Sequence, residues 1–150
     1  MSNLLLQPDL SGDGPIHDVT PASAGWSHVG FGLHDLAAGM SVGSEGTADE
    51  ICLVLLSGSV RIISGDLDTG MLQGRASVFD KVAPHAVYVP MKTAWRVDAC
   101  SDSELAVCRA PGTEGKLPPR LIGSQNMPLE TRGTGSNVRC LLYTSDAADE

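Results

Sequence analysis

The chain has 150 residues, of which 42% are hydrophobic and 19% charged, a composition that suits one globular domain with one core. Its formal net charge of −8 argues against nucleic-acid backbones and anionic membrane surfaces as partners. The first residues, MSNLLLQP, contain no basic side chain, and no apolar run reaches the length of a membrane span. We therefore expect a cytoplasmic protein with no nucleic-acid and no membrane partner.

Short apolar runs, separated by turn residues, follow one another in a chain that contains 17 glycines and 9 prolines. No window keeps apolar residues at helical spacing. The pattern predicts an all-β fold of the sandwich or jelly-roll type. The predicted strands are 28–33, 51–56, 60–63, 76–79, 86–89, 95–97 and 105–108. From Pro111 onwards, the composition is typical of a long extended connection.

The run from Ile51 to Leu56 is apolar at every position, so both faces of this strand are expected to be covered. Leu53 lies in its middle and is a predicted core residue. Cys52 and Cys108 lie inside apolar runs, and the chain has no C-x-x-C pair. They are therefore expected to be buried free thiols rather than metal ligands or disulfide partners.

A glycine-rich, acidic loop precedes this strand, in the segment GMSVGSEGTADEICLVLLSG, residues 39–58. This segment resembles the first of the two motifs of cupins, and YVPMKTAW, residues 88–95, resembles the second. At the positions of the cupin metal ligands the chain has Glu45, Thr47, Glu50 and Trp95, and Lys92 replaces a glycine.

A catalytic metal site of this kind needs about three protein ligands, usually with imidazole among them. An indole cannot serve as a ligand, so the resemblance predicts a barrel with no metal, no catalytic and no cofactor-binding residue. One alternative is that Glu45, Asp49 and Glu50 hold a hard cation; a solvated acidic turn is the simpler interpretation. The histidines are scattered without ligand spacing and are expected to be surface or capping residues: His17, His28, His34 and His85.

Several segments, in order and with compatible spacing, resemble the 5-deoxy-glucuronate isomerase family. They are VTPASAGWSHVGF (19–31), DEICLVLLSG (49–58), SVFDKVAPHAVYVP (77–90), LAVCRAPG (105–112) and ETRGTGSNVR (130–139). The family consists of bicupins, with two jelly rolls in a longer chain. The resemblance implies that this chain is the N-terminal part, and that a divalent metal, zinc or manganese, is bound by a His-x-His-x₃-Glu pattern in the second barrel.

The resemblance divides the chain into three parts. Residues 1–112 are a cupin-like barrel without metal, and residues 113–139 are an extended linker toward a second barrel that this chain does not contain. Residues 140–150, CLLYTSDAADE, depart from the family pattern. Translated back into codons, they resemble a transposase-type library adapter, so we expect a non-native tail.

Two functions remain open at this point. The resemblance implies a truncated isomerase. The full-length protein would interconvert 5-deoxy-glucuronate and its 2-keto isomer in inositol catabolism, and it would be a possible homo-oligomer. In this scheme the fragment alone is inactive, and its barrel packs against the second one. The alternative is a cupin without metal that binds a sugar acid, or an interaction module without catalysis.

Overall fold

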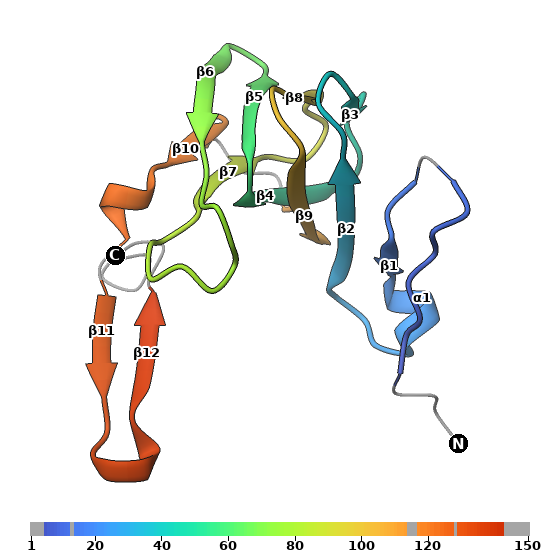
Figure 1. Ribbon diagram of the computed structural model, residues 1–150. Helices are drawn as coiled ribbons and strands as arrows, with labels where there is room; N and C mark the ends of the chain where they lie inside the picture. Colours follow the sequence, from blue (N-terminus) through green and yellow to red (C-terminus); the bar gives the residue numbers. More distant parts are fainter. Residues whose placement is uncertain (1–4, 13, 114–116, 128, 143–150) are drawn as a thin grey trace.

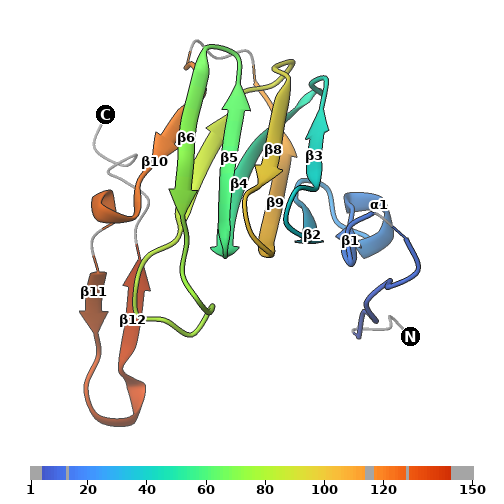
Figure 2. The ribbon, with the colours of Figure 1, turned by 45° about the horizontal axis from the view of Figure 1, so that its top comes forward.

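The computed structural model describes residues 5–12, 14–113, 117–127 and 129–142, which form two facing antiparallel sheets and a separate hairpin (Figure 1). The large sheet contains, in spatial order, β1 (His17–Val19), β2 (Gly30–Leu36), β9 (Ser103–Pro111), β4 (Asp49–Ser57), β7 (His85–Val89) and β10 (Arg120–Ile122). The small sheet contains β3 (Ser41–Ser44), β8 (Trp95–Ala99), β5 (Ser59–Ser64) and β6 (Leu67–Gln73). Figure 2 shows the small sheet in front of the large one. The all-β prediction is confirmed.

Short helices and a hairpin complete the described residues. The helix α1 (Pro21–Ala24) follows β1, and Thr20 caps its first turn. After β10 come the 3₁₀ helix η1 (Ser124–Asn126), β11 (Leu129–Arg132), the 3₁₀ helix η2 (Gly135–Asn137) and β12 (Arg139–Leu142). Strands β11 and β12 pair only with each other among the described residues, and they project away from the two sheets (Figure 1). Among those same residues, no helix is long and apolar enough to cross a membrane.

The core lies between the two sheets, because alternate residues of each strand point inward. Leu53 and Leu55 of β4 have no exposed surface. The other buried members are Leu36, Ile51, Val60, Ile62, Leu72, Val87, Val89, Trp95, Val97, Ala99, Leu105 and Val107. The predicted core position of Leu53 is therefore confirmed.

The opposite face of β4 is only partly covered, so the expectation of burial on both sides is wrong for this face. Cys52, Val54 and Leu56 are half-buried there. A small cluster of Ala83, Ala86 and Met127 packs against the first two. Leu56 is not a member of this cluster. Both Cys52 and Cys108 are free thiols as predicted, but they are half-buried on this outer face rather than in the core.

A tight turn joins β4 to β5 at Gly58, which has a φ of +84°. A Cβ at this position would clash with the backbone carbonyl of Asp102. The next residue is fixed as well, since the Ser59 N–H donates to the hydroxyls of Ser101 and Ser103, both at 3.0 Å. The turn at Gly58 is therefore in close contact with the turn that contains Ser101 and Asp102.

One predicted strand, 76–79, is wrong, because this segment forms bends and a turn between β6 and β7. The Asp80 carboxylate accepts hydrogen bonds from the backbone N–H groups of Ala76 and Ser77, at 3.0 and 3.1 Å. Arg75 donates to the carbonyls of Leu56 and Val82, at 3.2 and 3.3 Å. The Asp80 carboxylate thus binds the backbone of its own segment, which pairs with no strand in the described part of the chain.

The predicted connection from residue 113 contains β10, which adds to the edge of the large sheet beside β7. Of the predicted non-native tail, residues 140–142 belong to β12. Residues 143–150 lie outside the described part of the chain.

Candidate functional site

A cavity of about 350 Å³ lies between the two sheets, at the end where β3 and β8 face β2, β4 and β9. The short loop before β4 contributes Thr47 to it. Its lining is His34, Val42, Gly43, Ser44, Thr47, Asp49, Ile51, Trp95, Val107 and Arg109. The cavity therefore combines hydroxyl groups, an indole, a carboxylate and a guanidinium.

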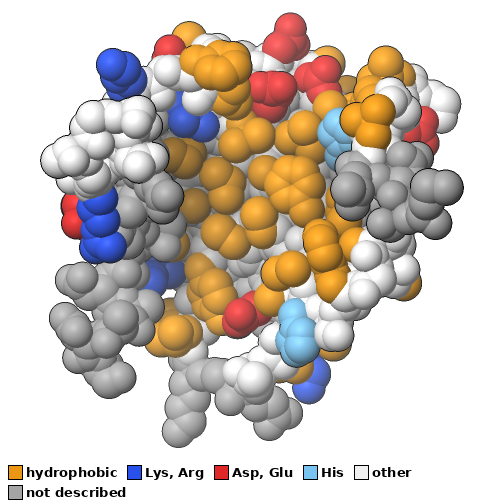
Figure 3. Space-filling model, turned by 90° about the horizontal axis from the view of Figure 1, so that it is seen from below, with side chains coloured by type: hydrophobic (Ala, Val, Ile, Leu, Met, Phe, Trp, Pro, Cys, Tyr) orange, Lys and Arg blue, Asp and Glu red, His pale blue; other side chains and the backbone are white. Residues whose placement is uncertain are grey.

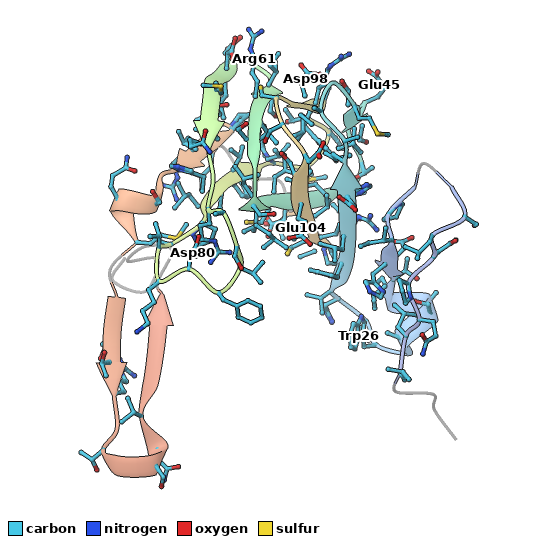
Figure 4. The ribbon with its side chains drawn as sticks, viewed as in Figure 1. Trp26, Glu45, Arg61, Asp80, Asp98 and Glu104 are labelled. Atoms are coloured by element: carbon cyan, nitrogen blue, oxygen red, sulfur yellow. The ribbon has the colours of Figure 1, made fainter. Side chains whose placement is uncertain are left out.

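The structure brings some of the cupin-motif positions to this cavity and separates others. Thr47 and Trp95 line it together with Asp49. Glu45 lies instead in a neighbouring open hollow of about 810 Å³ beside β3 and β8, and Figure 4 shows it at the upper end of the molecule. Glu50 faces away from the cavity: it accepts a hydrogen bond of 3.3 Å from the Tyr88 hydroxyl.

The acidic residues of the loop thus do not converge on one point. Among the described residues, no group of three or more His, Cys, Asp or Glu side chains could hold a metal ion. The alternative of a hard-cation site formed by Glu45, Asp49 and Glu50 is therefore not supported by their placement. Lys92, at the glycine position, has a positive φ of 59°, a conformation for which glycine is the usual residue.

His34 is a lining residue that the sequence analysis placed wrongly at the surface. It is only 8% exposed, and it faces the cavity from β2. Burial lowers the pKa of His34, and the nearby Arg109 charge lowers it further, while Asp18 acts in the opposite direction. The imidazole is therefore neutral at neutral pH.

Arg109 is the second residue that sequence reasoning missed. It lies on β9 and donates to the Asp18 carboxylate of the N-terminal segment at 3.0 Å. Because the Arg109 charge is so close to His34, a divalent cation would be repelled at the one imidazole of the cavity. The cavity residues do not fit a cupin metal.

The other histidines lie away from this cavity. His85 accepts a hydrogen bond of 3.2 Å at Nδ1 from the Ser124 N–H, at the start of η1. His28 is exposed, and His17 is half-buried on the edge strand β1.

Residues 4–148 match the KduI/IolB family. The chain belongs to this family. A 5-deoxy-glucuronate isomerase of Geobacillus kaustophilus is 40% identical over 140 residues, which cover 91% of this chain and 50% of that protein. The crystal structure of an IolB-like protein from Salmonella typhimurium has a TM-score of 0.88 and 38% identity, over 95% of this chain and 54% of the other.

A more distant structure agrees with the fold alone. An RmlC-like cupin with a double-stranded β-helix fold from Methanocaldococcus jannaschii has a TM-score of 0.50 at 15% identity, over 74% of this chain and 93% of that one. The predicted cupin-type jelly roll is confirmed. The chain of this KduI/IolB family member spans about half the length of the curated relatives it matches.

Proposed function

We propose that this chain is the first half of a 5-deoxy-glucuronate isomerase, a bicupin of inositol catabolism in the cytoplasm. The single observation that carries the proposal is the 40% identity to the Geobacillus kaustophilus isomerase, over 91% of this chain. The substrate is then a small sugar acid, 5-deoxy-glucuronate, and the product is its 2-keto isomer, 5-deoxy-2-keto-gluconate (2-deoxy-5-keto-gluconate).

An aldose–ketose isomerisation moves a proton between adjacent carbons through an enediol, so it requires a general base and a group that polarises the oxygens. A zinc or manganese ion in the second half would supply that polarisation. The cavity of this chain does not fit such an ion, because its imidazole lies beside the Arg109 guanidinium. We assign no step of the reaction to residues of this chain, which acts as a scaffold.

The test compares this chain with a fusion of residues 1–139 to the second half of the Geobacillus kaustophilus relative. We expect turnover of 5-deoxy-glucuronate by the fusion and none by the chain alone. Turnover by the chain alone, abolished by Asp49→Asn or His34→Gln, would place the active site in this barrel and contradict the proposal.

A second candidate function is the binding of a sugar acid without catalysis, and the cavity residues favour it. Thr47, Trp95 and Arg109 offer a hydroxyl, an indole and a guanidinium to a polyhydroxylated carboxylate. Asp18 and Asp49 oppose an anion there. Calorimetric titration of the chain with glucuronate distinguishes the two candidates.

The matched variants are Arg109→Met and Arg61→Met. The latter arginine pairs with Asp68 on the exposed side of the small sheet, away from the cavity. Binding that is lost only in Arg109→Met would favour the sugar-acid module. No heat of binding in either variant or in the unchanged chain would favour the scaffold.

A further inference from the structure

The outer face of the large sheet is apolar across its central strands. Strand pairing aligns the outward residues in cross-strand rows, and Figure 3 shows hydrophobic side chains gathered in the middle of this face. We call the following residues the apolar band. One row is Phe31, Cys108, Cys52 and Tyr88, and the next row is Leu33, Ala106, Val54 and Ala86.

The apolar band is incompletely covered by the described residues. Met127 and Ala83 pack against the part of the band nearest β10. At the other side of the band, Phe31 on β2 is 37% exposed. A hollow of about 170 Å³ opens beside Cys52, Tyr88 and Cys108, large enough for one apolar side chain. Ala86 and Ala106 of the band are buried, and the others are partly or fully exposed. An apolar surface of this kind that contains a hollow is typical of a protein–protein contact.

Acidic residues border the band at both ends of its strands. Asp35 of β2 and Glu104 of β9 are paired in the row beyond Leu33, and Figure 4 shows Glu104 on this side of the sheet. At the other end, the Glu50 carboxylate lies beside Tyr88. A complementary partner therefore presents an apolar centre with basic residues around it.

The path of the chain indicates which partner this is. After β10, at the edge of the large sheet, Met127 packs on the outer face against Ala83 and Ala86. The β11–β12 hairpin then projects on the same side of the molecule (Figure 1). The polypeptide thus leaves the barrel next to the apolar band, and the curated relatives have about as much chain again as this one covers.

We propose that the apolar band is the docking surface for the second half of the full-length protein. The inference rests on the proposed function in one respect only: it requires the second half of the family's proteins to follow this chain. It goes further by assigning the contact to one face, with Cys52 and Cys108 at its centre and basic groups opposite Glu50, Asp35 and Glu104.

Chemical modification of the free thiols of Cys52 and Cys108 measures whether the apolar band is covered. Burial, with a smaller contribution from Cys108, raises the pKa of Cys52 to about 11, and burial also raises the pKa of Cys108, so both react slowly. Each thiol is therefore compared with itself between two proteins: this chain, and the fusion of residues 1–139 to the second half of the Geobacillus kaustophilus relative. Both are treated with a maleimide at pH 8, and modification is measured at each residue by mass spectrometry.

We expect the modification rates of Cys52 and Cys108 to fall at least tenfold in the fusion, while exposed Cys100 reacts equally in both proteins. Phe31→Lys in the fusion should restore reaction at Cys108. The matched control is Met71→Lys, at a residue that is 69% exposed on the small sheet, and it should change nothing.

Unchanged rates at Cys52 and Cys108 would overturn the docking proposal, as would a fusion without a cooperative melting transition. Protection that rises with the concentration of this chain alone would identify a second copy as the occupant and also overturn it. Turnover of the fusion is measured in parallel. Protected thiols without turnover contradict the proposed function alone, and turnover with reactive thiols contradicts the docking surface alone.

Discussion

Truncation of Leu53 to alanine tests the position of β4 as the centre of the core. Leu53 is fully buried and lies between Val107 of β9 and Val87 of β7 in register, both of which are also buried. Leucine-to-alanine changes in cores cost about 2–5 kcal/mol, and the upper half of this range applies where neighbours on both sides are held by a sheet. We therefore expect a loss of about 4 kcal/mol.

For a chain of this size, about 2–4 °C is lost per kcal/mol, so the melting temperature should fall by roughly 12 °C. The assay is thermal unfolding by circular dichroism, with urea titration at 25 °C to obtain the free energy of unfolding. The matched control is Leu56→Ala, on the half-buried outer face of the same strand, for which we expect about 1–2 kcal/mol. Equal losses in the two variants would refute the assignment of the inward face. Leu53→Asp, which would bury an unpaired charge, should not fold at all.

Further predictions concern a titration, a terminal deletion and a turn. Arg109→Ala should raise the pKa of His34 but leave it below the ordinary histidine value, because burial remains; NMR titration of the imidazole measures it, and an unchanged pKa would contradict the proximity of the two charges. Since the folded-state pKa of His34 is lowered, its contribution to stability is present above pH 6.5 and is lost as the pH falls below that value. Deletion of residues 140–150 should shift the melting temperature by less than about 2 °C, because the paired part of this segment joins neither sheet; a larger loss would make it part of the fold. Gly58→Ala should cost at least about 2 kcal/mol by urea titration, and more than Gly70→Ala, which has a positive φ but open space around it. Equal costs would show that only backbone strain acts at this turn.

The fold class and the central strand could be predicted because buried strands appear in the sequence as short apolar runs between turn residues. The run 51–56 lies within β4, and the turns around it are rich in glycine and serine. β6 was missed for a physical reason. A register shift in its pairing with β5 inserts an extra residue, so that Leu67 and Leu72, an odd number of positions apart, both pack toward the core. A strict alternation pattern cannot detect such a strand.

The cavity itself was not predicted. Thr47 and Trp95 were singled out only as motif positions that lack a metal ligand. His34 was missed because the apolar run before it ends at Leu33, whereas β2 continues to Leu36. Arg109 could have been found, since it continues the inward alternation of Leu105 and Val107 on β9, but the strand was predicted to end one residue earlier. Polar residues that line a cavity lie inside strands, but strands are recognised in a sequence by their apolar residues. Such polar residues therefore fall outside the predicted strands.

The strand order also has a consequence during protein synthesis. β9 lies between β2 and β4 in the large sheet, although it follows both of them by a long stretch of chain. At a synthesis rate of about 5–20 residues per second, β2 and β4 emerge from the ribosome several seconds before the strand that joins them. During this interval the edge of β4 that pairs with β9 in the finished sheet has no partner. A nascent chain of this fold therefore relies on chaperones, or on pairing of the other edge of β4 with β7, to limit aggregation until β9 closes the sheet.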